Sequence, residues 1–252
     1  APPDFANTIE ALEQAEDALE RVSGLFFNLA GADSTPAREA LQRDLAPRLS
    51  QHASEVAMNR PLFARIEALW ARREGLGLDP EQARVLELYR RMFLRAGAGL
   101  EAGPARRLTA VKARLAVLGT AFAQNLLADE RVWFMDLGDE ALAALPGFVQ
   151  EAARAAGAER GRPGAVVTLN RSLIVPFLQY SPDRDLRRRA FEAWAARGAN
   201  GDGNDNRAIA AEILALRAER AALLGHADFA SYKLETEMAG SAAAVRDLLA
   251  QV

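Results

Sequence analysis

The residue types that most often carry catalysis are scarce in these 252 residues, which contain two histidines and no cysteine. A disulfide scaffold, a thiolate zinc site and a cysteine nucleophile all need the residue type that is absent. His52 and His226 lie 174 positions apart, so these residues contain no H-E-x-x-H zinc helix. His226 follows a predicted helix end and His52 lies on a predicted helix. Each histidine therefore fits a structural role better than a ligand role. The residue chemistry therefore predicts no catalytic, cofactor-binding or metal-ligating residue here.

Two short motifs resemble binding loops. Gly97 to Ala102 nearly matches the dinucleotide fingerprint G-x-G-x-x-G/A, but it follows a predicted helix rather than a strand, so a helix C-cap and turn is expected. Asp202 to Asn206 begins like a calcium loop, yet the sixth and twelfth loop positions hold Arg207 and Ile213. A calcium loop needs glycine and glutamate there. We expect a polar turn that caps the next helix.

Three further patterns are interpreted as ordinary surface features. The triplet Asn170-Arg-Ser172 is a formal glycosylation sequon, of a kind that is frequent by chance. The run Arg187–Arg189 and the acid pairs Glu16-Asp17 and Glu235/Glu237 fall on predicted helices, where such charges usually form the solvated face. None of them indicates a phosphate site or an acid–base pair.

The overall charge gives no reason to expect a nucleic-acid or membrane partner. The net charge is −3, and 29 arginines, against only 2 lysines, are spread along the chain among 34 acidic residues. The bias toward arginine and alanine is typical of a GC-rich bacterial genome. No apolar run reaches the roughly 18 residues of a membrane span. We expect a bacterial protein, in the cytoplasm rather than the periplasm.

The first part of the chain has the periodicity of helices. A first helix is predicted from a capping box at Asn7 and Glu10 to a turn at Gly31–Ser34. A second begins at Thr35-Pro36 and is kinked by Pro47. The expected buried face of the first helix is Ile9, Leu12, Leu19, Val22, Phe26 and Leu29, and that of the second is Leu41, Leu45, Leu49 and Val56.

Three more helices complete this part. One begins near Pro61 and buries Phe63, Ile66 and Trp70. The next begins at Asp79, with Gln82 three residues later as in a capping box. The last runs from about Pro104 to Asp129. Residues 1–130 are therefore predicted to form an antiparallel helical bundle.

The pattern changes after Arg131. Val132–Leu137 and Val166–Leu169 have the composition of strands, and the segment between them reads as a helix broken at Pro146-Gly147. Later helices are predicted from Asp183 to about Arg197, from Asn206 to Leu224, over Ala227 to about Glu237, and from Ser241 onward. The last of these has no stop signal, so we expect the chain to be cut within a helix. The predicted fold class is mostly α, with a small β insertion.

An ordered series of stretches resembles the thimet-oligopeptidase-like (M3) family of zinc metallopeptidases, and within it the peptidyl-dipeptidases. No single motif is diagnostic, but the order of the stretches is. The stretches are Pro3–Leu12, Arg21–Phe27, Asn59–Arg65, Arg72–Asp79, Arg95–Leu100, Leu118–Asn125, Asn206–Leu214, Arg217–Gly225, Phe229–Tyr232 and Met238-Ala239.

The resemblance implies a neurolysin-like helical region that forms one wall of a narrow channel for short peptides. The family's zinc-binding H-E-x-x-H helix, third carboxylate ligand and catalytic tyrosine and histidine lie in later sequence. The implied organisation is a bundle over residues 1–130, followed by a β insertion and helices over 131–252 that continue into a missing catalytic region. The parent would be a zinc enzyme, whereas this part alone would bind no zinc and be inactive. The alternative is a stand-alone helical interaction module without catalysis.

Overall fold

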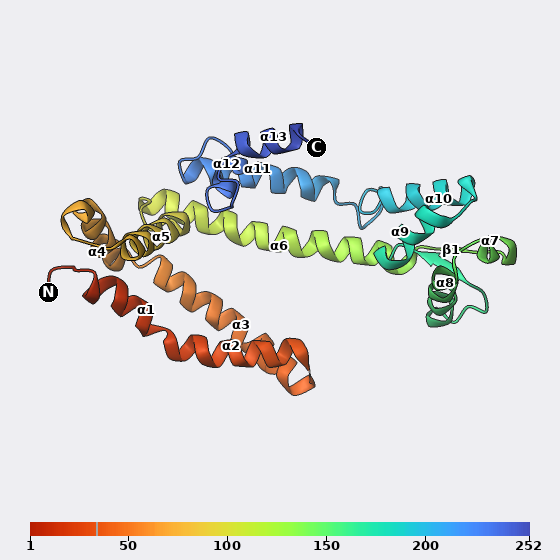
Figure 1. Cartoon of the computed structure of the whole chain (residues 1–252), viewed down its shortest axis with the longest axis horizontal. Coiled ribbons are helices and arrows are strands. Elements are labelled where there is room, and N and C mark those ends of the chain that lie inside the picture. Colours follow the sequence, from red (N-terminus) through yellow and green to blue (C-terminus); the bar gives the residue numbers. More distant parts are fainter. Residues whose placement is uncertain (34) are drawn as a thin grey trace. The chain divides into compact units, whose positions relative to one another are not determined.

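The computed structural model describes the backbone of residues 1–33 and 35–252, and their side chains except those of Glu39 and Arg43. The fold is mostly helical with one small antiparallel two-stranded sheet, so the predicted fold class is confirmed (Figure 1). The chain divides into two compact units, one made of residues 1–110 and 221–252 and the other of residues 111–220. The predicted boundary at residue 130, between the helical bundle and the part that leads into a catalytic region, stays a prediction.

The helices of the first unit come from both ends of the sequence. They are the π-helical turn η1 (Ala6–Glu10), α1 (Ala11–Ala15), α2 (Asp17–Ala32), α3 (Pro36–Ala57), α4 (Arg60–Ala71), the 3₁₀ turn η2 (Arg73–Gly75), α5 (Pro80–Ala96), α12 (Phe229–Leu234) and α13 (Ala242–Ala250). The second unit contains most of α6 (Ala102–Val132), then β1 (Phe134–Asp136), α7 (Asp139–Ala143), α8 (Gly147–Glu159), β2 (Val166–Thr168), α9 (Arg171–Tyr180), α10 (Arg184–Ala195) and most of α11 (Arg207–Leu223).

The first helical segment begins earlier than predicted. Asp4 Oδ1 accepts a hydrogen bond from the backbone N–H of Asn7 at 2.7 Å, and Asn7 Oδ1 accepts one from the N–H of Asp4 at 3.0 Å. This is the reciprocal pattern of a capping box. The predicted box at Asn7 and Glu10 is therefore wrong by three residues, because Asn7 is the second member of the pair and not the first.

The predicted buried face of the first segment is only partly buried. Ile9 is inaccessible to solvent, whereas Leu19, Val22 and Leu29 on α2 are 40%, 68% and 45% exposed. Periodicity identifies an amphipathic helix but not whether another element covers it, which is why the expectation failed on α2. The predicted turn at Gly31–Ser34 is partly corrected, since α2 continues to Ala32; Ser34 itself lies outside the described residues.

The start of α3 is confirmed. Thr35 Oγ1 accepts a hydrogen bond from the N–H of Arg38 at 3.3 Å, and proline occupies the first helical position. The helix continues through Pro47 to Ala57. Its expected buried side is weaker than predicted, because Leu41 is 51% exposed and Leu45, Leu49 and Val56 are half-buried.

The core of the first unit lies between α4 and α5. Phe63 and Ile66 are buried as predicted, and the Phe63 and Phe93 rings stack with their centroids 6.0 Å apart. The capping box of α5 is also confirmed: Asp79 Oδ1 accepts from the N–H of Gln82 at 2.8 Å, and Gln82 Oε1 accepts from the N–H of Asp79 at 3.2 Å. The cap fixes where α5 begins and so which side chains face α4.

We expect Asp79→Ala to lower the free energy of unfolding by about 1 kcal/mol, because the N-terminal N–H groups of α5 lose their acceptor. Asp79→Asn is the matched control, since asparagine caps helices as well as aspartate. Urea unfolding of both variants measures the difference. Equal stability of Asp79→Ala and the unsubstituted chain would mean that the Asp79 cap does not stabilise α5.

The second unit is built around the predicted small sheet. Strands β1 and β2 pair antiparallel with Phe134 opposite Thr168 and Asp136 opposite Val166. All three residues of β2 are buried, where the strand packs against α8 and α9. The predicted break between α7 and α8 at Pro146 is confirmed.

Helix α9 was not predicted. It covers Arg171–Tyr180 and contains Pro176 in its interior, and that proline within a short apolar run gave no clear helical signal. Asn170 caps it, because its Oδ1 accepts from the N–H of Ser172 at 2.9 Å. The next helix, α10, is capped by Asp183 as predicted.

Candidate functional site

The two motifs that resemble binding loops are structural, as expected. Gly97 has φ +103° and ends α5, with the N–H groups of Gly97 and Ala98 donating to the carbonyls of Leu94 and Phe93. This is a helix C-cap. The polar turn at Asp202–Asn206 precedes α11, where Asp205 Oδ1 accepts from the N–H of Arg207 at 2.9 Å.

The loop before α11 encloses one buried carboxylate. Asp129, 8% exposed, accepts hydrogen bonds from the N–H of Gly198 at 2.7 Å, from Asn200 Nδ2 at 2.9 Å and from Asn204 Nδ2 at 3.3 Å. Three donors satisfy this charge without a metal ion. Asp129 thus positions the loop that leads into α11.

Asn206 was predicted as the cap of α11, and this is only partly confirmed. Its carbonyl accepts from the Ala210 N–H at 2.7 Å, as the carbonyl of an N-cap residue does, but its side chain does not cap the helix. Its side chain is buried and points to α6, where Nδ2 donates to the Phe122 carbonyl at 3.0 Å and Oδ1 accepts from Asn125 Nδ2 at 2.9 Å. Asp205 takes the capping role instead. A tertiary partner outcompeted the local one, because a buried amide must satisfy both its donor and its acceptor.

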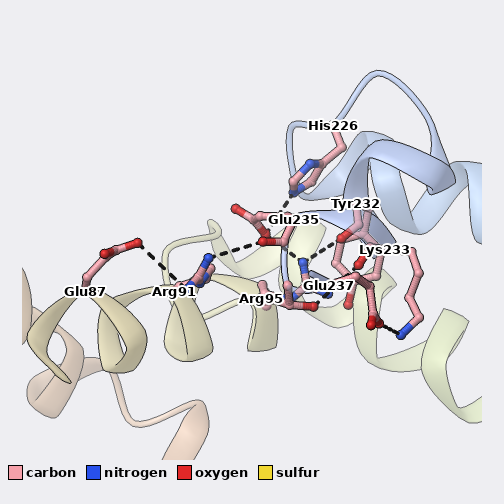
Figure 2. Close-up of polar contacts among 9 residues, drawn as sticks. Glu87, Arg91, Arg95, His226, Tyr232, Lys233, Glu235 and Glu237 are labelled. Atoms are coloured by element: carbon pink, nitrogen blue, oxygen red, sulfur yellow. Dashed lines mark hydrogen bonds and ion pairs between the residues drawn. The ribbon is translucent and has the colours of Figure 1, made fainter. Parts of the chain in front are cut away.

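A cluster of polar side chains joins α5 to the α12 segment, and Figure 2 shows it. Arg95 is at its centre. Its Nη1 donates to Glu235 Oε2 at 2.6 Å and to the Tyr232 carbonyl at 2.7 Å, and its guanidinium carbon lies 3.9 Å from the Tyr232 ring centroid. Arg91 adds a hydrogen bond to the Glu235 carbonyl at 3.3 Å. The two arginines hold a segment about 140 positions away in sequence.

His226 lies beside this cluster without forming an acid–base pair. Its ring packs edge-on against Tyr232 at 5.4 Å between centroids, and its Nε2 is 4.0 Å from Glu235 Oε2 (Figure 2). That oxygen already accepts from Arg95, so the Glu235 carboxylate is committed to a guanidinium. The arrangement is a clamp that positions α12.

Three of the acids singled out in the sequence, Glu16, Glu235 and Glu237, lie at ion-pair distance from a basic side chain. Glu235 and Glu237 were expected on a helix, and this is wrong, because α12 ends at Leu234. Glu237 contacts Lys233, four residues earlier at the end of α12, and the pKa of Glu237 is lowered, first by the hydrogen bond to Lys233. Glu16 lies 3.1 Å from His52 Nε2. Glu16 and its neighbours also affect Tyr89, whose pKa is raised by burial first and then by a hydrogen bond to Glu13.

Two of the three arginines in the run Arg187–Arg189 have partners near the ends of α9 and α10. Arg187 donates to the Ser181 carbonyl at the end of α9, and Arg188 pairs with Asp185 at 3.1 Å. In the sequon, Asn170 Oδ1 is taken by the Ser172 N–H and hydroxyl.

The residues do not fit a zinc ion. Within residues 1–33 and 35–252, no group of three histidine, cysteine, aspartate or glutamate side chains is placed to hold a metal. His52 lies on α3 with Glu16, whereas His226 lies beside Tyr232 and Glu235. Among the described residues, each histidine therefore lies apart from any set of side chains that could hold a metal.

Comparison with known proteins finds similarity to peptidases along nearly the whole chain. Residues 177–252 match the sequence profile of Peptidase family M3. Dipeptidyl carboxypeptidase of Escherichia coli (strain K12) is 34% identical over 99% of this chain, and oligopeptidase A of Salmonella typhimurium is 30% identical over 99%. A second dipeptidyl carboxypeptidase, from Salmonella typhimurium, is 32% identical over 95% of the chain.

These matches confirm the resemblance of this mostly helical chain to peptidase family M3, a family of zinc peptidases, that was seen in the sequence. The chain spans about 37% of the length of the E. coli dipeptidyl carboxypeptidase and 35–37% of the two Salmonella relatives. In the part of the chain that the structure describes, no helix has both the length and the apolar character needed to cross a membrane.

Proposed function

We propose that these residues form one wall of the peptide channel of a zinc-dependent peptidyl-dipeptidase or oligopeptidase. The observation that carries the proposal is the 34% identity to a dipeptidyl carboxypeptidase along 99% of this chain, over 37% of that relative. The match of residues 177–252 to the M3 profile supports a chain that leads into a catalytic region. Zinc ligands and catalytic acid–base groups come from outside these residues.

The proposed division of labour assigns binding and size selection to this part. A channel wall excludes folded proteins and admits short peptides, while the metal chemistry takes place elsewhere. The clamp at Arg95 and Glu235 supports such a role, because it fixes helices with hydrogen bonds and leaves no reactive group free among the residues it joins. We place the complete enzyme in the bacterial cytoplasm and expect this chain alone to be inactive.

The test is to read the coding sequence after Val252 and to express its complete product. We expect an H-E-x-x-H motif and release of C-terminal dipeptides from N-blocked peptides, lost on chelation and restored by zinc. The 252-residue chain assayed beside it should show no hydrolysis. Internal cleavage without dipeptide release would favour an oligopeptidase within the same family. A stop codon directly after Val252, with a folded chain that binds a protein partner, would favour the stand-alone interaction module.

A further inference from the structure

The second unit contains a pocket lined by residues from three of its helices. It has a volume of about 610 Å³ and lies between the end of α6, the C-terminal half of α8 and the start of α9. Strand β2 packs against two of these three helices, α8 and α9. Figure 1 shows α8 and α9 close to the strands. The volume is in the range of pockets that hold small ligands.

Two guanidinium groups give this pocket its charge. Arg131 on α6 donates from Nε to the Leu127 carbonyl at 3.2 Å, and Arg160 just after α8 donates from Nη1 to the Ala156 carbonyl at 3.5 Å. Among the described residues, neither guanidinium contacts a carboxylate. Both therefore keep N–H donors for an external acceptor, and arginine presents these donors in a fork that matches a carboxylate.

The acidic residues at the pocket do not cancel this charge. Glu130 is held by Arg197, which lies outside the pocket lining. Glu159 is the one remaining acid among the described lining residues, against the two arginines. Its carboxylate accepts hydrogen bonds only, so it suits a ligand that carries N–H groups next to its anionic group.

The rest of the lining separates into a polar and an apolar side. On the polar side, Asn170 uses its Oδ1 for Ser172, which leaves its Nδ2 as a donor. Thr168, 3% exposed, accepts from the Asn170 N–H at 3.4 Å and retains its hydroxyl proton for donation. On the other side, α8 contributes alanines 152, 155 and 156, which offer a smooth surface for alkyl groups.

We propose that this pocket binds a carboxylate of a peptide, with Arg131 and Arg160 as its charge partners and Glu159 as acceptor for a peptide N–H. The inference rests on the proposed function, because it names the substrate feature that this wall recognises. A peptide supplies the anionic group, the N–H donors and the small side chains that the lining accommodates. An inorganic anion would use the two arginines but neither Glu159 nor the alanine surface. The carboxylate belongs either to the peptide C-terminus or to an acidic side chain.

Calorimetric titration of the 252-residue chain tests the proposal with three N-acetylated tetra-alanine-based peptides. One ends in a free carboxylate, one ends in an amide, and one ends in an amide but has an internal glutamate. We expect at least one carboxylate peptide to bind 10-fold or more tightly than the neutral peptide, and the identity of that peptide names the source of the carboxylate. Equal binding of all three peptides, or binding of none, would overturn the proposal.

The double variant Arg131→Gln/Arg160→Gln should lose the preference for the carboxylate peptide. Arg154→Gln is the matched control, because Arg154 lies on the exposed face of α8 and outside the pocket, with Gln150 as its partner at 3.2 Å. Circular dichroism checks that all variants fold, and the two single variants are measured if the double variant does not. Retention of the preference in the arginine variants contradicts the assignment, as does binding of inorganic phosphate without any discrimination among peptides. Hydrolysis by the complete gene product is measured separately, so failure of the pocket and failure of the proposed function are distinguished.

Discussion

The variant Gly157→Ala is expected to lose about 3 kcal/mol or more of unfolding free energy, or to leave the second unit unfolded. A Cβ at this position on α8 would lie 2.0 Å from the Gly164 carbonyl oxygen and 3.1 Å from its carbonyl carbon. Both are backbone atoms in the segment that leads into β2, so no side-chain rotation relieves the overlap. Overpacked cores lose about 1–3 kcal/mol and occasionally more. Urea unfolding followed by circular dichroism measures the loss.

Gly119→Ala is the matched control, because the same substitution at this position should have the opposite sign. Gly119 lies in the interior of α6 and a Cβ there would meet nothing within 4 Å. Alanine in a helix interior is more stable than glycine by roughly 0.5–1 kcal/mol. If Gly157→Ala unfolds at the same urea concentration as Gly119→Ala, the close approach of α8 to the β2 segment is not rigid.

The variant Arg95→Met is expected to cost about 2–4 kcal/mol in the first unit. The substitution keeps an unbranched stem but removes the hydrogen bonds to Glu235 and the Tyr232 carbonyl, together with the cation–π contact. Hydrogen bonds to charged groups contribute about 1.5–3 kcal/mol each, and cation–π contacts roughly 0.5–2 kcal/mol. Partial exposure of Glu235 keeps the total below their sum. Thermal and urea unfolding both report the change.

Arg84→Met on the same helix provides the comparison. Arg84 is 56% exposed and pairs with Glu87 one turn later on α5. Exposed pairs of this kind contribute about 0.3–0.5 kcal/mol, so this variant should remain close to the unsubstituted chain. Similar losses for the two variants would mean that α12 is not held to α5 through Arg95.

The parts of the fold that sequence could predict are those that depend on near neighbours. The capping box of α5 needs only Asp79 and Gln82, the end of α5 needs only Gly97, and the break between α7 and α8 needs only Pro146. The two strands were recognised from β-branched and aromatic residues in two short runs. In each case one or two residues determine the local backbone, so no knowledge of the rest of the chain is required.

The parts that sequence missed depend on distant partners. Asn206 has the residue type of a helix cap, but Asn125 and the Phe122 carbonyl on α6 bind its amide. Leu19 and Val22 follow the helical period, yet they are exposed on α2. The pocket at Arg131 and Arg160 joins residues from α6 and the end of α8, so no spacing rule relates them. The chain contains 29 arginines, so nothing in the sequence distinguishes Arg131 and Arg160 from the others.

The division of the first unit between residues 1–110 and 221–252 sets the order of events during synthesis. The second unit is one continuous stretch, so all its partners leave the ribosome together, while α5 must wait for α12. At roughly 5–20 residues per second, the wait between residue 110 and residue 252 lasts about 7–28 seconds. During that time Arg95 has no Glu235, and residues 1–110 lack the partners that residues 221–252 supply. The emergence of residues 221–252 from the ribosome, rather than the chemistry of any one contact, therefore sets when this unit closes.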